Sequence, residues 1–310
     1  MVRTIKLNDG KSIPALAWGN GTGGIEHSGQ KAIDTGVVAL KAGILHIDTA
    51  QIYGTEKEAG QAIPAAGLDR KDIWVTTKLS EASHVKTNHA DIKRSVQESI
   101  DKIGFVPDMI LIHTPFVPEN GKLVEFWQGL EALVEDGTLK GCSIGVSNYR
   151  PQDIEELMKV AKLTPAVNQM EYHPYVLNHL DPLLALQKEH NIVTQAYGPL
   201  TPVIRHPTGG PLKPVLEKIA KRISKDTGKE VDSAVVLLQW TIQMGVVAVT
   251  TSGNPGNVRK MAQGETFGKE GDLTKAEMDE IEEAGRKVHF RGYKEHMTKE
   301  FPEPDLPQDL

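Results

Sequence analysis

The hydrophobic positions of this chain fall into short runs, each of which leads into polar side chains. The runs are four or five residues long, a length that suits strands buried on both faces of a parallel sheet. They occupy residues 15–18, 44–47, 73–77, 109–112, 142–146, 166–170, 192–196 and 246–249. We predict that each of these eight runs forms a strand.

Between the runs, apolar residues recur with the three- or four-residue spacing of a helix that buries one face. Residues 92–103, 123–134 and 154–161 show this spacing. Strands that alternate with helices predict a parallel sheet, and eight strands are the number at which such a sheet closes into a barrel. We therefore predict an α/β fold, a (β/α)8 TIM barrel, as one domain over residues 1–310.

Both ends of the chain depart from this repeat. Asp9 and Gly10 separate two short apolar runs, which predicts an amino-terminal hairpin over residues 3–16 that caps another part of the fold rather than joining a parallel sheet. Residues 286–310 are aromatic but aperiodic and end in prolines and acids. We predict that they form a substrate-site loop over the barrel mouth, followed by an irregular tail.

Two helices are predicted in addition to those of the repeat. One covers residues 211–224, ahead of the repeat helix at 231–243. The other begins after Thr274, which forms a capping box with Glu277.

Composition and charge exclude several classes of protein. Lysine and arginine number 35 against 41 aspartates and glutamates, without a long block of like charge, so we expect neither a nucleic-acid partner nor a membrane partner. The amino terminus lacks the apolar core of a signal peptide, and no apolar run approaches the roughly 18 residues of a membrane span. The single cysteine, Cys142, excludes an internal disulfide and suits a reducing compartment. The expected location is cytoplasmic.

The stretch ILHIDTAQIYG, residues 44–54, carries the most chemistry, because its strand leads into Asp48 and Tyr53. Two further strands lead into Lys78 and His113. The carboxyl ends of barrel strands meet on one face, so these side chains are expected to converge. Taken singly, each has an ordinary structural explanation.

Together these four side chains predict a proton relay. A tyrosine of pKa about 10 must be lowered by about 3 units to ionise readily at neutral pH, and one ammonium about 4 Å away supplies roughly that shift. Lys78 is the candidate ammonium, Asp48 would hold it charged and in place, and His113 would hydrogen-bond a substrate oxygen.

Later strands end in neutral hydrogen-bonding groups. Ser147 and Asn148 follow the fifth run, Gln169 ends the sixth and Tyr197 follows the seventh. The first three suit a carboxamide, although caps and turns explain any one of them. Tyr197 offers an aromatic face for a flat ring, with core packing as the alternative.

A glycine motif, GNGTGG at residues 19–24, satisfies GxGxxG, and Asp48 follows at about the distance of a ribose-binding acid. Pro14 leaves only a very short strand ahead of the motif, and the expected helix cap, Ser28, comes several residues after it. We therefore do not assign a Rossmann domain, although the glycines allow a backbone to approach a phosphate.

The motifs DTAQIYG, VTTKL, LIHTP, IGVSN, NQMEYHP and AYGPL, each at an expected strand end, resemble those of the aldo-keto reductase superfamily. The resemblance runs from the hairpin to about Asn257 and is strongest to the fungal ketoreductase branch of conjugated polyketone reductases and α-keto amide reductases. It implies hydride transfer from NADPH, with NADH as an alternative donor, to the carbonyl of a small-molecule aldehyde or ketone. No metal is implied, and we expect a monomer or weak dimer.

The resemblance also implies residue roles. Carried over by position, Tyr53 is the general acid, Lys78 lowers its pKa, Asp48 pairs with Lys78, and His113 orients the carbonyl. The implied cofactor-binding residues are Gly21, Thr22, Asp48, Ser147, Asn148, Gln169, Tyr197, Gly198, Leu200, Thr250, Thr251, Ser252, Gly253, Asn257 and Arg259. The implied substrate-binding residues are Tyr53, His113, Phe116 and Tyr293.

One departure from the family pattern concerns the cofactor. Many relatives carry proline, lysine and serine after the eighth strand, where the lysine meets the 2′-phosphate of NADPH. Here the run is Thr250, Thr251 and Ser252. Arg259 and Lys260 lie close by in the sequence and are candidate replacements, because a phosphate contact needs only a reachable cation.

A second departure concerns the substrate. Gly21 and Thr114 stand where tryptophans are usual, which predicts a wider pocket. We therefore favour activated ketones such as α-keto esters, α-keto lactones or dicarbonyls over simple sugars. Candidate pocket walls, each also explained by ordinary packing, are Trp18, Phe116, Phe290 and Tyr293.

Three alternatives stay open. The first is an aldehyde or aldose-type reductase of the same superfamily. The second is a Schiff-base aldolase that uses Lys78, which borohydride trapping with a carbonyl substrate would reveal. The third is a barrel that binds NADPH without catalysis, which a substrate-dependent loss of NADPH absorbance would exclude.

Overall fold

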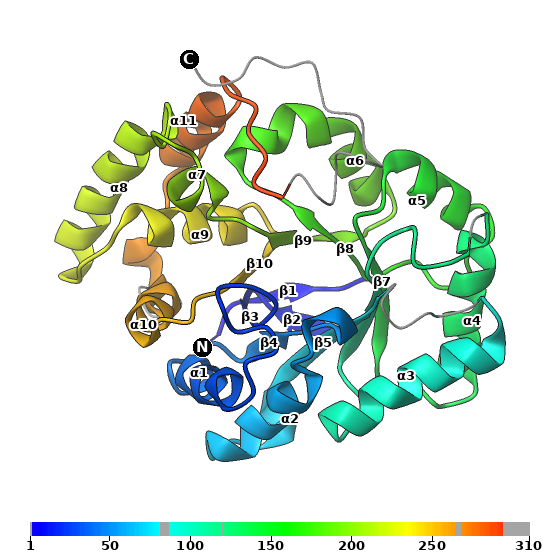
Figure 1. Cartoon of the computed structure of the whole chain (residues 1–310). Helices are drawn as coiled ribbons and strands as arrows, with labels where there is room; N and C mark the ends of the chain where they lie inside the picture. Colours follow the sequence, from blue (N-terminus) through cyan, green and yellow to red (C-terminus); the bar gives the residue numbers. More distant parts are fainter. Residues whose placement is uncertain (1, 81–86, 120, 265–267, 294–310) are drawn as a thin grey trace.

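A closed barrel of parallel strands forms the centre of the chain (Figure 1). The structure is a computed structural model that describes residues 2–80, 87–119, 121–264 and 268–293. β10 pairs with both β9 and β3, which closes the ring and confirms the predicted TIM barrel. Its eight strands are β3 (Leu16–Gly19), β4 (His46–Asp48), β5 (Trp74–Leu79), β6 (Met109–Ile112), β7 (Ser143–Ser147), β8 (Val167–Glu171), β9 (Val193–Tyr197) and β10 (Val247–Thr250).

The strands extend further toward their carboxyl ends than most of the apolar runs. The run at 109–112 coincides with β6, and the other strands end one or two residues later than predicted. The hydrogen-bonded ladder therefore continues into polar residues, so that Asp48, Lys78 and Tyr197 are themselves strand residues. Their positions are fixed by strand pairing rather than by a loop.

Helices cover the outside of the barrel (Figure 1). The helices of the repeat are α1 (Gln30–Lys41), α2 (Glu56–Ala65), α3 (His89–Ile103), α4 (Leu123–Glu135), α5 (Pro151–Met158), α6 (Leu177–Glu189), α9 (Ser233–Gln243) and α10 (Pro255–Gln263). Short 3-10 turns connect some elements, and these are η1 (Gln51–Tyr53), η2 (Arg70–Asp72), η4 (Pro174–Val176) and η6 (Gly268–Gly271).

The extra helices form where they were predicted. α8 (Leu212–Thr227) packs on α9, a helix that is apolar on all sides and therefore needs a cover on its outer face. α11 (Lys275–Gly285) starts with the predicted capping box of Thr274 and Glu277. A short helix that the sequence did not predict, α7 (Thr201–Ile204), follows β9.

The glycine-rich loop after β3 belongs to the barrel, since the described residues form no parallel sheet other than the closed ring. The predicted cap of α1 is wrong. The helix begins after Gly29, whose φ of 55° favours glycine, whereas the Ser28 hydroxyl donates to the carbonyl of Ile25.

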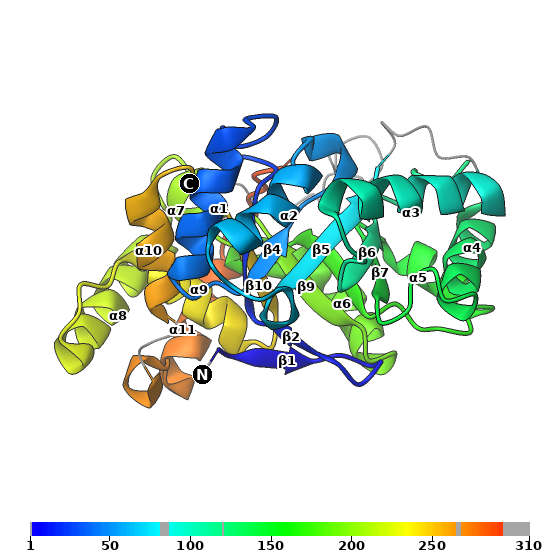
Figure 2. The same ribbon diagram turned by 90° about the horizontal axis from the view of Figure 1, so that it is seen from below.

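The amino-terminal hairpin lies across the amino-terminal ends of the barrel strands (Figure 2). β1 (Thr4–Lys6) pairs antiparallel with β2 (Ser12–Pro14). Asn8 donates to the carbonyl of Pro165 at 2.9 Å, and Ser143 donates to Asp9 at 2.6 Å. The hairpin side chains Leu7 and Ile13 join the apolar cluster at this end. These contacts confirm a capping hairpin outside the parallel sheet and show that it covers the barrel.

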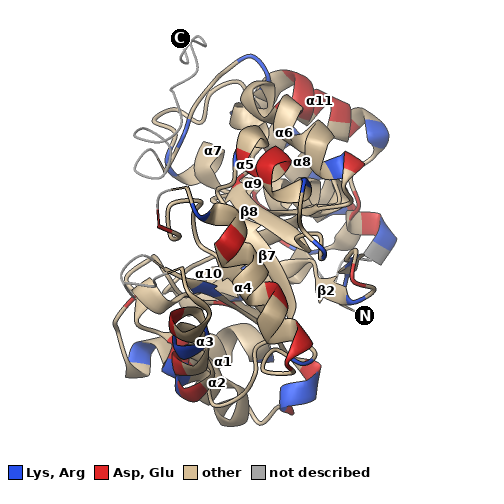
Figure 3. Ribbon diagram, turned by 90° about the vertical axis from the view of Figure 1, so that its right-hand side faces the viewer, with Lys and Arg blue, Asp and Glu red and all other residues tan. Residues whose placement is uncertain are grey.

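Charges of both signs are interspersed on the outer helices of the face shown in Figure 3. Among the described residues, no helix combines the length and the apolar character that crossing a membrane requires. The predicted loop at 286–310 is described only as far as Tyr293, which reaches the barrel mouth, and 294–310 lie outside the described residues.

Candidate active site

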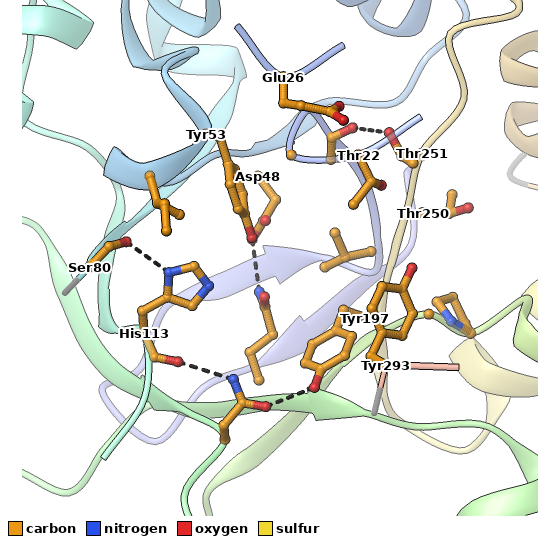
Figure 4. Close-up of a pocket in the computed structure, with 18 of the residues that line it drawn as sticks. Thr22, Glu26, Asp48, Tyr53, Ser80, His113, Tyr197, Thr250, Thr251 and Tyr293 are labelled. Carbon is orange, nitrogen blue, oxygen red and sulfur yellow. Dashed lines mark hydrogen bonds between the residues drawn. The ribbon is translucent and has the colours of Figure 1, made fainter. Parts of the chain in front are cut away.

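A cavity of about 520 Å³ opens at the carboxyl ends of the barrel strands (Figure 4). The side chains around it come from strands and turns that are far apart in the sequence. The predicted residues that line it include Asp48, Tyr53, His113, Asn148, Gln169, Tyr197 and Tyr293. The barrel therefore brings these predicted side chains together.

A buried ion pair between Lys78 and Asp48 lies beneath the other side chains that line the cavity. The Lys78 Nζ lies 2.5 Å from Asp48 Oδ1, and the two side chains are 0% and 3% exposed. The same ammonium donates to the carbonyl of Thr49 at 2.9 Å. Asp48 Oδ2 accepts hydrogen bonds from Gln169 at 2.8 Å and from Gln195 at 3.3 Å. A buried pair of charges persists only when such additional hydrogen bonds offset its desolvation.

Lys78 is held as a cation by its neighbours. Burial alone would lower its pKa, but Asp48 and Tyr53 together hold the pKa of Lys78 above its ordinary value. A Schiff-base nucleophile must be a neutral amine, so this environment disfavours the aldolase alternative.

Tyr53 lies directly beside this ammonium. The Lys78 Nζ is 5.0 Å from the centroid of the Tyr53 ring, and the two side chains are hydrogen-bonded. Burial raises the pKa of Tyr53 above its ordinary value, and the charge of Lys78 offsets this only in part. The predicted net lowering of the Tyr53 pKa is therefore wrong, because desolvation of the phenolate outweighs the attraction to Lys78. The phenol is protonated at neutral pH, which is the state that a proton donor requires.

His113 flanks Tyr53 at the cavity wall. The two rings meet edge to face, with centroids 5.7 Å apart and an interplanar angle of 86°. His113 Nδ1 lies 2.8 Å from the hydroxyl of Ser80, which orients the imidazole. Ser80 was not predicted, although its position two residues after Lys78 at the end of β5 was an available signal.

Gly21 brings the glycine-rich loop against Tyr53. A Cβ at this position would lie 2.4 Å from Cε2 of the Tyr53 ring, closer than any side chain permits. A side chain at position 21 would therefore displace either the loop or the Tyr53 ring from the place it holds here. Further along the same loop, Glu26 and His27 also line the cavity and were not predicted.

Asn148 is the centre of a polar network at the other wall. Its φ of 60° is uncommon for a residue with a side chain. Its amide donates to the carbonyl of His113 at 3.1 Å and to Ser147 at 3.2 Å, and it accepts from the Tyr197 hydroxyl at 2.8 Å. Ser147 in turn donates to the carbonyl of Gln169 at 2.9 Å. These bonds stabilise the unusual backbone and join the ends of β7, β8 and β9.

The predicted cofactor residues divide into two groups. Those that line the cavity are Gly21, Thr22, Asp48, Asn148, Gln169, Tyr197, Gly198, Leu200, Thr250 and Thr251. Those that do not are Ser147, Ser252, Gly253, Asn257 and Arg259. Ser147 is buried beneath Asn148, whereas Asn257 and Arg259 are exposed on α10, next to the end of β10.

The predicted pocket walls are only partly correct. Tyr293 lines the cavity, but Trp18, Phe116 and Phe290 do not. Trp18 is buried on the outer side of β3, against Gly36 of α1. Phe116 lies under the guanidinium of Arg150 at 5.3 Å, and Phe290 packs on a neighbouring histidine ring at 4.8 Å. These three aromatic residues pack against neighbouring parts of the protein instead of lining the cavity.

Two exposed apolar residues on the cavity rim were not predicted. Ile52 is 47% exposed and Ile204 is 65% exposed, and both line the cavity. Neither lies in a pattern that sets it apart in the sequence, since Ile52 belongs to the turn η1 and Ile204 to the short helix α7. They give the entrance an apolar character.

The sequence of this chain is similar to those of known proteins along almost its whole length. The model of the Aldo/keto reductase family matches residues 16–286. An NAD/NADP-dependent indole-3-acetaldehyde reductase of Schizosaccharomyces pombe is 32% identical over 94% of this chain and 98% of its own. An NADPH-dependent alpha-keto amide reductase of Saccharomyces cerevisiae is 34% identical over 90% of this chain and 89% of its own.

Solved structures agree with this similarity. An aldo/keto reductase from Brucella melitensis superposes with a TM-score of 0.76 at 33% identity and covers 92% of this chain and 100% of that one. A Bombyx mori aldo-keto reductase in complex with NADP gives a TM-score of 0.76 at 30% identity, over 91% of this chain and 92% of its own.

Proposed function

The chain belongs to the aldo/keto reductase family, and from that premise we propose that it reduces neutral, activated ketones with hydride from NADPH and a proton from Tyr53. It is an NAD(P)H-dependent oxidoreductase that acts on carbonyl groups; the substrate, the cofactor preference and the residue roles are our proposal. The observation that carries the proposal is the placement of Tyr53 between the Lys78 ammonium and His113 in the cavity wall.

Each side chain has a defined task in the proposed reaction. Tyr53 is protonated and lines the cavity, so its hydroxyl can donate a proton to the carbonyl oxygen as the carbonyl carbon accepts hydride. Lys78 stabilises the phenolate that remains, and Asp48 holds Lys78 in place. His113, oriented by Ser80, hydrogen-bonds the same carbonyl oxygen and so fixes its direction.

The residues at the other wall fit a nicotinamide. When bound, the cofactor supplies the hydride. Tyr197 would provide a ring face for stacking, and Asn148 and Gln169 would meet the carboxamide. Their amides already donate hydrogen bonds within the protein. These bonds fix the orientation of the two side chains, and with it the direction of the donors and acceptors that are left for the cofactor.

NADPH is preferred over NADH in this proposal because of Arg259. Within the described part of the chain, the cavity lining contains no lysine or arginine, so the 2′-phosphate needs a cation from outside the cavity. Lys260 lies 3.6 Å from both Glu230 and Asp232, which compete for its charge. Arg259 is the better phosphate partner, consistent with a relative that is NADPH-dependent.

Neutral activated ketones are the favoured substrates because of the cavity walls. Among the described lining residues the charged ones are Glu26 and Asp48, and Asp48 is neutralised by Lys78. Glu26 therefore leaves a net negative charge that disfavours anionic substrates. The apolar rim of Ile52 and Ile204 suits an uncharged organic substituent, so we favour α-keto esters, amides and lactones over α-keto acids and sugars.

The proposal is tested by removing one hydroxyl. In Tyr53→Phe, kcat for ketone reduction should fall by on the order of a hundred- to ten-thousandfold, the contribution of a positioned acid, with the Kd for NADPH unchanged. Tyr149→Phe is the matched control, because it removes a tyrosine hydroxyl that is buried away from the cavity and has no hydrogen-bond partner among the described residues. Turnover of Tyr53→Phe at the wild-type rate would contradict the proposal, as would borohydride trapping of substrate on Lys78.

A further inference from the structure

Glu171 ends β8 with a buried carboxylate that the reaction itself does not require. The side chain is 2% exposed. It lies two residues after Gln169 and therefore on the same side of the strand, toward the cavity. Burying a carboxylate is costly unless hydrogen bonds replace its water, so the partners of Glu171 indicate what it does.

Those partners belong to the carboxyl-terminal segment of the chain. Glu171 accepts a hydrogen bond from the backbone N–H of Gly292 at 2.6 Å and a longer one from Tyr293 at 3.4 Å. His173 Nε2 lies 3.0 Å from the same carboxylate. Burial alone would raise the pKa of Glu171, but His173 and the two backbone donors hold that pKa below its ordinary value. Glu171 is therefore a carboxylate at neutral pH, and it acts as an anchor for residues 292 and 293.

The anchored segment carries a wall of the cavity. The Tyr293 ring lines the cavity and meets Tyr197 edge to face at 5.2 Å. It also lies so close to Gly198 that a Cβ there would come within 2.5 Å of Tyr293 Cε2. Arg205 donates to the carbonyl of Gly292 at 2.9 Å and covers the Tyr293 ring at 4.2 Å. The ring is thus held between the loop after β9 and the cavity.

We propose that Glu171 is a positioning residue for substrate selection, whose carboxylate fixes the backbone at 292–293 so that Tyr293 presents its ring to the larger substituent of the ketone. This inference rests on the proposed function and adds a determinant of its substrate preference. A ring held beside Tyr197 favours a flat or aromatic substituent next to the reacting carbonyl. Without the anchor, the backbone at 292–293 loses its carboxylate partner, the Tyr293 ring shifts from this place, and the preference weakens.

The test compares an aromatic α-keto ester, ethyl benzoylformate, with a small one, methyl pyruvate. In Glu171→Gln, kcat/KM for ethyl benzoylformate divided by kcat/KM for methyl pyruvate should fall about tenfold. The Kd for NADPH should stay unchanged. Tyr293→Ala should cause the same fall. Because Glu171 acts by positioning Tyr293, the two effects should not add. The substrate ratio of the double variant should be no lower than that of either single variant.

A second buried glutamate supplies the matched control. Glu131 in α4 is 7% exposed and accepts backbone hydrogen bonds from Lys162 and Leu163 at 2.7 and 2.8 Å, outside the cavity lining. Glu131→Gln should lower thermal stability about as much as Glu171→Gln but leave the substrate ratio unchanged. If Glu171→Gln does not fold, Glu171→Asp keeps the charge, shortens the reach and should show an intermediate ratio.

The outcomes distinguish a failure of the anchoring role of Glu171 from a failure of the proposed substrate class. Unchanged substrate ratios in both Glu171 variants, or additive losses in the double variant with Tyr293→Ala, would refute the anchoring role. If the wild-type protein reduces neither ester with NADPH, the proposed substrate class fails instead. Retained reduction of methyl pyruvate in the Glu171 variants shows that the catalytic groups are intact.

Discussion

Replacing Lys78 by methionine tests whether the buried ion pair serves catalysis rather than stability. The change leaves the Asp48 carboxylate, 3% exposed, with the amides of Gln169 and Gln195 as its side-chain partners among the described residues. Breaking a buried pair in this way typically costs about 3 to 5 kcal/mol. For a chain of 310 residues, an unfolding entropy of about 2.1 cal/mol/K per residue gives about 0.65 kcal/mol/K, so Lys78→Met should lower Tm by roughly 6 °C.

The double variant Asp48→Asn/Lys78→Met removes both charges and should recover most of this loss. A neutral pair of similar size is often as stable as the ion pair it replaces, because neither group pays for the desolvation of a charge. Ketone reduction should stay strongly impaired in both variants, since the phenolate at Tyr53 has lost its nearest cation. Urea denaturation and steady-state kinetics on the same preparations provide the two readouts.

Either of two results would contradict these expectations for the ion pair. The loss of stability in the double variant could equal the sum of the losses in Lys78→Met and in Asp48→Asn alone. That result would show that removing the second charge does not compensate for removing the first. A double variant that reduces ketones at the wild-type rate would show that the pair has no catalytic role.

Three further predictions follow from other described residues. Glu26→Gln should raise kcat/KM for anionic α-keto acids about two- to fivefold and leave esters unchanged, because a like charge several ångströms away in a solvated rim costs roughly 0.5 to 1 kcal/mol; equal effects on acids and esters would contradict this. Arg259→Ala should raise the Kd for NADPH and not for NADH, whereas Lys260→Ala should change neither substantially; an equal effect on both cofactors would exclude a 2′-phosphate contact. Burial lowers the pKa of His46 to about 4 in the fold, so this histidine takes up its proton more readily when unfolded. The free energy of unfolding should therefore fall by up to about 3 kcal/mol as pH drops from about 6.5 to 4, and urea titrations of His46→Gln should lack this part of the pH dependence.

The barrel itself was predictable because its strands are buried on both faces. Such strands appear as continuous apolar runs, and the polar side chains that end them, such as Asp48 and His113, mark the face where they converge. The hairpin was predictable for a local reason as well, since Asp9 and Gly10 form a turn by their own conformational preferences.

Features that depend on long-range packing were not predictable. Trp18 and Tyr293 appeared equivalent in the sequence but play different parts. The strand register of β3 turns Trp18 toward the helices, whereas Tyr293 reaches the cavity because the segment after α11 docks on Glu171. The net direction of the Tyr53 pKa shift depends on how deeply the phenol is buried, which the neighbouring charge alone does not determine. The Glu171 anchor joins residues 121 positions apart, and neither partner has a local pattern that indicates the other.

The hairpin at the opposite end of the barrel determines how the protein can be handled as a catalyst. It covers the amino-terminal ends of the strands (Figure 2), while the cavity opens at their carboxyl ends. A molecule tethered to a solid support through residues ahead of Thr4 would direct its cavity away from the surface. Reagents in the surrounding liquid would then reach the entrance without passing the support.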